Sequence, residues 1–371
     1  MAEFDEGTLR IGVDGILNRW ATVGLAVGMV RRDSMEFFRG HGLADIASGT
    51  PVTQDTVFRI ASITKTFTAI AVMQLSEQGL IDLDGPAGRY LRAYRLAPAK
   101  AGFRPATIRH LLTHTAGIRE VLHPSGPTVA EMFQPHYQAD PRIPGIGLAF
   151  FRTDLGDHFA VEHQGLLPGF DSHILVAPDD ATAVMAFVTG SPGPLHWLAS
   201  ETSGLMRQLF GVPDPVVRTD IAHHPEVWQE LCGWYRFSTR LTDPALFAIG
   251  AGAGAEVVVR RGRLAMRFLS PIPGLWRAMD LHPDDQKDPY VFRFKLPWFG
   301  AGTDTGRVLF SRKPGVGVTG MHFDFVPISL AKQPAATNPR PWATGVAAAM
   351  GVAAAVTAVG RRRKARAEVG S

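Results

Sequence analysis

Four short apolar segments separated by tight turns are the feature that most constrains how this 371-residue chain can fold. The segments are 147–152, 158–163, 173–177 and 183–189, and the residues between them include Gly, Pro and Asp, which are typical of turns. A short turn can join two antiparallel strands, whereas two parallel strands need a crossover of about a dozen residues or more. The pattern therefore predicts an antiparallel sheet.

Predicted helices accompany this sheet in the first part of the chain. Because the strands are mostly joined by tight turns, residues 1–212 are predicted to form an α/β domain of the α+β kind, an antiparallel sheet flanked by helices. The helices are expected over 8–20, from 61 to about 78, over 107–113 and over 194–210, and a strand hairpin is expected within 23–42.

The second part of the chain predicts a separate all-β domain, and the total length is sufficient for two domains. Short strands recur at regular spacing over 228–330, as in 256–260 and 263–268 around an Arg-Gly turn. Residues 213–227 and 331–341, which are polar and contain proline, are predicted to be linkers.

The charge distribution argues against a nucleic-acid-binding protein. The last eleven residues carry five basic groups and one acidic group, which accounts for the whole net charge of +4. Nucleic-acid binding needs a basic surface on the folded domain itself, and the rest of the chain is close to neutral. Cys232 is the only cysteine, so neither a disulfide within the chain nor a thiolate metal cluster can form.

The C-terminal segment leaves the location of the protein open. Residues 342–360 contain no charged side chain and are followed by the basic tail 361–371. Nineteen residues are long enough to span a bilayer, but their Ala, Gly and Val content makes the hydrophobicity marginal. A membrane anchor through 342–366 is weighed against a loosely packed Ala-rich tail, and the anchor is slightly preferred. The N-terminus lacks the pattern of a secretory signal, so the alternative location is cytoplasmic.

A serine and a lysine three positions apart stand where the helix beginning near Ala61 starts. Ser62 could be an N-cap, but a capping motif has Glu or Gln three residues later, and Lys65 carries the opposite charge. Positions i and i+3 share a helix face, so the amine can reach the hydroxyl. The alternative to a cap with a solvated lysine is therefore a serine nucleophile with a lysine base, a pair suited to acyl transfer.

Three segments in order resemble a known superfamily. Phe-Arg-Ile-Ala-Ser-Ile-Thr-Lys-Thr-Phe-Thr-Ala, residues 58–69, is similar to the nucleophile segment of the serine β-lactamases, penicillin-binding proteins and family VIII esterases. Residues 107–118 resemble the second landmark of that superfamily, and 162–180 resemble its third active-site strand and the strand that follows. The resemblance covers about residues 8–210.

The resemblance implies roles for specific residues. Ser62 would be the acyl-enzyme nucleophile and Lys65 its base, with an oxyanion hole formed by the backbone N–H groups of Ser62 and Leu166. The third motif, Lys-Thr-Gly in many lactamases, is here His163-Gln-Gly165, the form found in esterase-like and peptidase-like members. No cofactor is implied.

A zinc site is the weaker alternative for two histidines on the helix predicted at 107–113. His110 and His114 are four residues apart, but no Glu directly follows His110 and no third ligand is evident. No metal is therefore expected, and a hydrogen-bonding role is preferred for His114.

One motif of the superfamily is missing from the sequence. Members carry Tyr-x-Asn or Ser-x-Asn between the second and third landmarks, whereas the only tyrosine between His114 and His163 is Tyr137, in the non-matching context Tyr-Gln-Ala-Asp. The interval is also shorter than is usual in the superfamily. We therefore expect an internal deletion near 126–127 that removes most of the helical lobe.

The sequence thus predicts a serine hydrolase that cleaves a small-molecule ester, amide or peptide through an acyl-Ser62 intermediate. His163 in the third motif favours an esterase-like or D-peptidase-like substrate over a β-lactam. Because the tyrosine motif is missing, activity is expected to be weak or lost. The alternative is a catalytically inactive binding or surface protein that keeps the fold.

Overall fold

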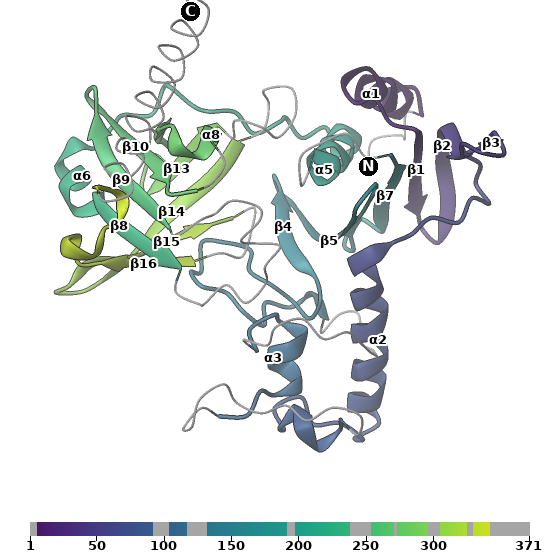
Figure 1. The fold of residues 1–371 in the computed structure, drawn as a ribbon, viewed down its shortest axis with the longest axis horizontal. Coiled ribbons are helices and arrows are strands. Elements are labelled where there is room, and N and C mark those ends of the chain that lie inside the picture. The colour runs from purple at the N-terminus through teal and green to yellow at the C-terminus, as the bar shows by residue number, and fades with distance from the viewer. Residues whose placement is uncertain are drawn as a thin grey trace, which may run out of the picture.

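The protein is built on two antiparallel sheets, which lie side by side in the computed structural model (Figure 1). The second sheet confirms the all-β region predicted for the C-terminal part of the chain. The structure describes residues 6–91, 104–116, 132–190, 197–237, 254–270, 273–295, 305–324 and 329–341.

The first sheet has seven strands in the order β3-β2-β1-β7-β6-β5-β4, and every pairing in it is antiparallel, as the tight turns predict. Central strand β1 is buried along most of its length because both faces of the sheet are covered. The strands are β1 (Gly24–Arg31), β2 (Ser34–Asp45), β3 (Thr50–Pro51), β4 (Phe151–Leu155), β5 (His158–Leu167), β6 (Phe170–Ala177) and β7 (Thr182–Thr189).

The position predicted for the first of the four strands was wrong. It was expected at 147–152, but β4 begins at Phe151. Gly145 and Ala149 both have positive φ angles, of 81° and 61°, so the backbone before Phe151 turns instead of extending. Glycine tolerates that conformation, but a left-handed alanine leaves no signal in the sequence.

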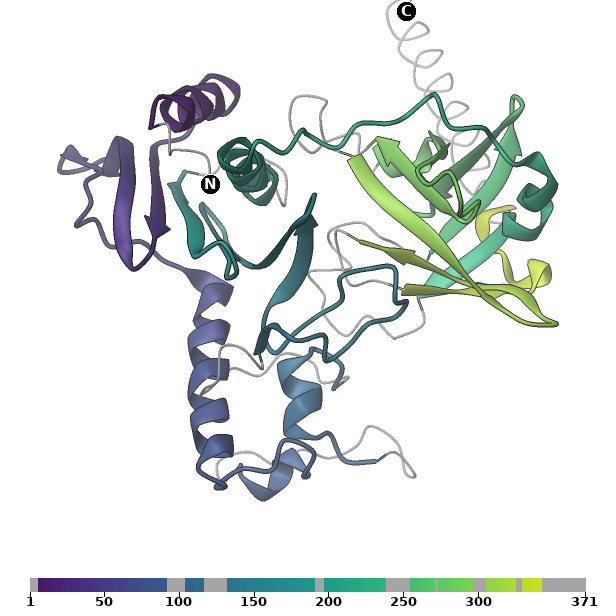
Figure 2. The ribbon, with the colours of Figure 1, turned by 180° about the vertical axis from the view of Figure 1, so that it is seen from behind.

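Helices cover both faces of the first sheet. Helices α1 (Glu6–Arg19) and α5 (Trp197–Phe210) pack on one face, where α1 contributes Leu9, Val13 and Ile16 at helical spacing. Helices α2 (Thr64–Glu77) and α3 (Ile108–Leu112) lie on the opposite side and extend away from both sheets, as seen from the front and from behind (Figures 1 and 2).

The buried side of α2 is formed by Thr66, Ala69 and Met73, whereas the apolar Phe67 is 61% exposed. The helix is apolar on more than one side, so periodicity alone cannot select the face that packs.

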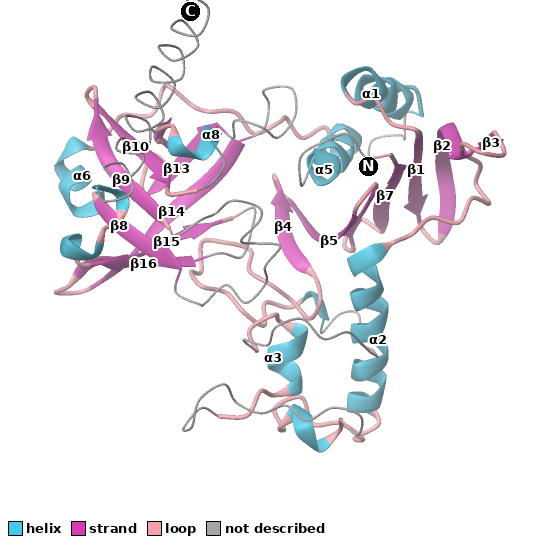
Figure 3. Ribbon diagram, viewed as in Figure 1, coloured by secondary structure: helices cyan, strands magenta, loops and turns pink. Residues whose placement is uncertain are grey.

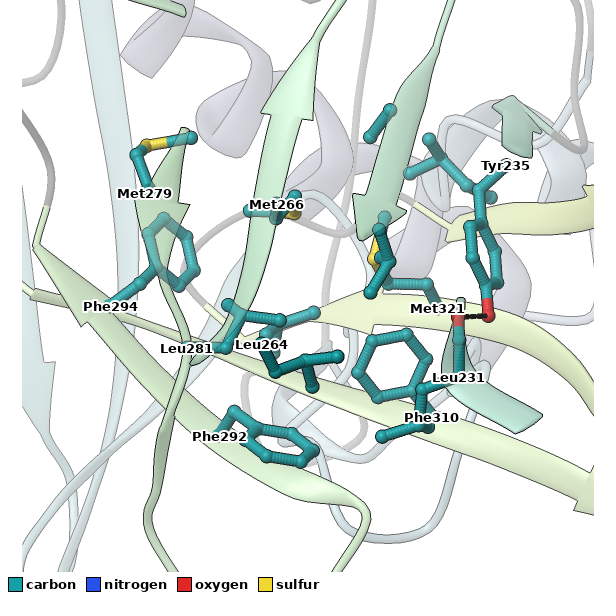
Figure 4. Packing of buried hydrophobic residues seen from close by; sticks show 14 of the residues in the cluster. Leu231, Tyr235, Leu264, Met266, Met279, Leu281, Phe292, Phe294, Phe310 and Met321 are labelled. Atoms are coloured by element: carbon teal, nitrogen blue, oxygen red, sulfur yellow. Dashed lines mark hydrogen bonds between the residues drawn. The ribbon is translucent and has the colours of Figure 1, made fainter. Parts of the chain in front are cut away.

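Within the described residues, the second sheet has nine strands in the order β11-β10-β9-β8-β16-β15-β14-β13-β12 and also has only antiparallel pairings. Figure 3 shows the strands of the two sheets in magenta. The core of the second sheet is aromatic: the Tyr235 and Phe292 rings both pack edge-on against Phe310 (Figure 4). The strands are β8 (Gly233–Phe237), β9 (Ala255–Arg260), β10 (Arg263–Phe268), β11 (Met279–Asp280), β12 (His282–Pro283), β13 (Val291–Lys295), β14 (Thr305–Lys313), β15 (Gly317–Phe323) and β16 (Ser329–Gln333).

Two predicted boundaries of the C-terminal region differ from the structure. Trp228, where the strands were expected to start, lies in helix α6 (Pro225–Leu231). Residues 331–333, predicted to begin a linker, belong to β16, which lies between β8 and β15. The described residues also include a short helix, α8 (Pro273–Trp276), and the 3₁₀ turns η1 (Ala61–Ile63), η2 (Ala87–Arg89) and η4 (Ala335–Thr337).

Within the described residues, no helix has both the length and the apolar character needed to cross a bilayer. The predicted anchor at 342–360, the basic tail and the expected deletion site at 126–127 all lie outside those residues.

Candidate active site

Ser62 and Lys65 form a direct contact at the start of α2. Ser62 lies in η1, Lys65 lies in the first turn of α2, and the Lys65 Nζ donates a hydrogen bond to the Ser62 Oγ at 2.8 Å. Both side chains are partly buried. No side chain caps the start of η1 or of α2, so neither the N-cap interpretation of Ser62 nor a solvated Lys65 describes the structure.

The backbone around Ser62 is held in a strained turn. Ala61 has a φ of 45°, a left-handed conformation that costs free energy in a residue with a Cβ. The turn is fixed at the preceding carbonyl, because Ile60 O accepts hydrogen bonds from Ile63 N at 3.0 Å and from Ser172 Oγ at 3.1 Å. Ser172 is fully buried on β6, so the sheet itself anchors the turn.

Gly165 explains why the third motif ends in glycine. A Cβ at this position of β5 would lie 2.2 Å from Ile60 O and 2.3 Å from Ser172 Oγ. Only glycine therefore lets β5 pass so close to the turn that carries Ser62. The structure brings the His163-Gln-Gly165 motif beside the Ser62–Lys65 pair.

The edge of β5 from His163 onward is not paired with another strand among the described residues. Strand β4 pairs with β5 only as far as Glu162, and among the described strands none pairs with that side of 163–167. Leu166, the residue after Gly165, lies on this edge and is partly buried. An unpaired strand edge presents backbone N–H groups, the kind of donor an oxyanion hole requires.

His163 is buried in its neutral form. Its Nδ1 lies 2.8 Å from the Gln164 carbonyl oxygen, which can only accept, so Nδ1 carries the proton and Nε2 has the lone pair. Burial, reinforced by the nearby charges of His114 and Lys65, lowers the pKa of His163 to about 3. Its Nε2 has no hydrogen-bond partner within the described part of the chain.

Phe151 lies between the two histidines of the second and third landmarks. Its ring centroid is 5.7 Å from that of His163 and 6.2 Å from that of His114, with the His114 ring nearly parallel to it. His110 does not share this position, since its Nδ1 accepts from Thr107 N in a capping box at the start of α3. His110 and His114, which were considered as a zinc pair, therefore have different local roles in the structure.

No described tyrosine hydroxyl is hydrogen-bonded to Ser62. The hydroxyls of Tyr90 and Tyr235 bond to Asp82 N and Leu231 O, and that of Tyr290 bonds to Glu230. Tyr137 is joined through its backbone to Ile146. The expected lack of a tyrosine partner for Ser62 therefore stays a prediction for the chain as a whole.

Sequence reasoning missed two residues that shape the site. Ser172 and Phe151 reach the Ser62 region only through the sheet, from 110 and 89 positions further along the chain. Neither belongs to a local pattern that spacing could reveal. A serine facing the glycine of the third motif across the β5–β6 hairpin was the one available signal for Ser172.

The site combines a serine–lysine contact at a helix start with a glycine-containing strand of an antiparallel sheet that helices cover. This arrangement is suited to acyl transfer, and the sequence comparisons agree with that class. The family model described as Beta-lactamase matches residues 14–132. The sequence matches support a relationship between the chain and the β-lactamase-related serine hydrolase superfamily.

Among its relatives is esterase EstB of Burkholderia gladioli, 32% identical over 202 residues, which covers 54% of this chain and 48% of that protein. A β-lactamase of Yersinia enterocolitica is 31% identical over 145 residues, covering 38% of this chain and 36% of the other. The chain thus spans half or less of the length of these curated relatives. A solved structure of SurE with D-Leu is similar in fold alone, with a TM-score of 0.55 at 16% identity over 88% of this chain and 98% of that one.

Proposed function

We propose that the protein hydrolyses an ester or amide through an acyl intermediate on Ser62. The observation that carries this proposal is the 2.8 Å hydrogen bond between the Lys65 Nζ and the Ser62 Oγ. When the amine is neutral, the same contact lets it accept the hydroxyl proton as the oxygen attacks a carbonyl carbon.

The remaining steps follow from the groups beside this pair. The negative charge on the carbonyl oxygen would be stabilised by the backbone N–H groups of Ser62 and Leu166. The Lys65 ammonium then returns the proton to the departing alcohol or amine. A water molecule, deprotonated by the same amine, attacks the acyl-Ser62 carbonyl. The bond from the acyl carbon to the Ser62 Oγ breaks, the Lys65 ammonium returns the proton to Oγ, and the acid is released.

An ester-like or D-peptide-like substrate is favoured over a β-lactam. The third motif supplies a buried neutral histidine instead of a lysine, so it adds no positive charge for an anionic substrate group. The similarity to a protein named as an esterase points in the same direction, although the match covers only part of that protein.

The alternative is a catalytically silent member of the superfamily that binds a ligand or partner. It is favoured by the observation that no described tyrosine hydroxyl lies in hydrogen-bond contact with Ser62. Loss of one acid–base partner typically slows a reaction by about 10²–10⁴-fold, which would leave the serine reactive but slow.

Labelling with a fluorophosphonate probe distinguishes the two functions. We expect one phosphonyl group per chain, mapped by mass spectrometry to the peptide containing Ser62, and no labelling of Ser62→Ala. Ser76→Ala, which removes another serine of the same helix, should label normally. A folded protein that takes up no probe, or takes it up equally after Ser62→Ala, would support the binding protein.

A further inference from the structure

Arg142 joins the segment before β4 to the C-terminal sheet. Its Nη1 lies 2.6 Å from the Asp288 Oδ2, and its Nη2 donates to Phe310 O at 2.9 Å. Within the segment before β4, the Nε and Nη2 of Arg142 each donate to the Asp140 carboxylate at 2.8 Å. The guanidinium therefore uses all three nitrogens, in the bidentate geometry that fixes position best.

The contact between Arg142 and Asp140 is partly buried, so it differs from an ion pair exposed on the surface. The Asp140 side chain is 7% exposed, and although burial would raise the pKa of its carboxyl, the hydrogen bonds from Arg142 leave that pKa below its ordinary value. The adjacent Ile143 is buried against Val291 and Leu309 of the C-terminal sheet. The polar clamp and the apolar contact thus hold the same short segment.

From this segment, backbone contacts lead directly to the active site. Pro144 O accepts from the Arg152 Nη1 at 2.6 Å, and Gly145 O accepts from Arg152 N at 3.1 Å. The next residue, Ile146, forms an antiparallel bridge with Phe151. Phe151 is the residue that packs against His163, beside the Ser62–Lys65 pair.

We propose that the C-terminal sheet sets the geometry of the Ser62 site through Arg142, which makes Arg142 a positioning residue for the reaction. The inference rests on the proposed function of Ser62. Loss of the clamp loosens the contact of residues 142–146 with the second sheet, lets Phe151 shift, and displaces the ring that packs against His163. A displacement of about 1 Å at a reacting group is enough to cost up to about 100-fold in rate.

The test compares Arg142→Met with Arg312→Met in the full chain. Arg312 of β14 also forms an ion pair, with Glu230 of α6, and it stacks on Tyr290, but it contacts no residue of the first sheet through these interactions. Two quantities are measured: the second-order rate constant for fluorophosphonate labelling of Ser62, and the imidazole resonances of His163 in histidine-labelled protein, assigned with His163→Gln.

We expect Arg142→Met to slow labelling by about tenfold or more and to shift the His163 resonances, because the ring current of Phe151 changes with its position. Arg142→Lys should restore part of the rate, and Arg312→Met should change neither quantity. If Arg142→Met does not fold, Asp288→Asn weakens the same clamp from the other sheet and should give the same two effects.

The two readouts separate this inference from the proposed function. Wild-type protein that does not label would contradict the proposed chemistry, while the His163 resonances would still report whether Arg142 positions the site. An unchanged rate together with unchanged His163 resonances in the Arg142 variant, or in Asp288→Asn if that variant replaces it, would overturn the inference.

Discussion

His163 combines burial with a ring nitrogen that has no hydrogen-bond partner among the described residues, and its protonation should therefore affect stability. Its pKa is about 3 in the folded protein, against an ordinary value of 6.5 for histidine, and the charged or titratable groups around it are His114, Lys65 and Glu162. Between these two values the unfolded chain binds a proton that the folded protein does not bind. The stability contributed by a neutral His163 is therefore complete above pH 6.5 and is lost as the pH falls toward 3.

Replacing His163 by Gln tests this linkage. Gln cannot titrate, so the free energy of unfolding of the wild type, minus that of His163→Gln, should fall by about 2 kcal/mol between pH 7 and pH 5. Urea unfolding at several pH values measures the difference. Parallel stability curves for the two proteins would show that His163 is accessible to protons in the folded state.

Individual residues differ in how far the sequence could predict them. The contact between Ser62 and Lys65 could be anticipated because three positions along a helix is a fixed local distance. Phe151 and Ser172 could not, because their distance from Ser62 depends on which strands pair and how the sheet packs. Residues whose role depends on tertiary packing have no signature in local spacing.

At the scale of elements, the contact between β5 and η1 depends on Gly165. We expect Gly165→Ala to destabilise the protein by about 1–3 kcal/mol, because the new methyl group must displace the Ile60 carbonyl or Ser172. It should also slow labelling of Ser62, which lies two residues after Ile60. Thermal unfolding and the labelling rate measure the two effects.

Gly28→Ala provides the matched control within the same sheet. Gly28 lies on β1, and a Cβ there would come no closer than 3.9 Å to its nearest neighbour, Phe37 O. Its effect on stability and labelling should be small. Equal effects of the two substitutions would mean that the close approach of β5 to the turn is not what Gly165 provides.

The elements that the sequence predicted well are those defined by local pattern. The hairpin of β1 and β2 follows from two apolar runs around a short polar break, and the hairpin of β9 and β10 follows from two short strands around an Arg-Gly turn. The missed helix α6 does carry a recognisable signal, proline in its first turn. Strand β16 carries none, because a polar five-residue strand is stabilised by its partners β8 and β15 and not by its own pattern.

For the whole molecule, the resemblance of three short motifs predicted the arrangement of the first sheet and its helices, and the C-terminal sheet followed from its regular strand spacing. What no local pattern could predict is how the two sheets contact each other, since Arg142 and Asp288 are 146 positions apart. That contact joins the second sheet to the segment preceding β4.

The account as a whole depends on Lys65 acting as the base for Ser62, and one rate measurement tests it most directly. We predict that Lys65→Met lowers the rate constant for fluorophosphonate labelling of Ser62 by about 10²–10⁴-fold at neutral pH, because the hydroxyl loses its proton acceptor. Lys313→Met, at an exposed position of β14, should label at the wild-type rate. Labelling of Lys65→Met at the wild-type rate would contradict the account.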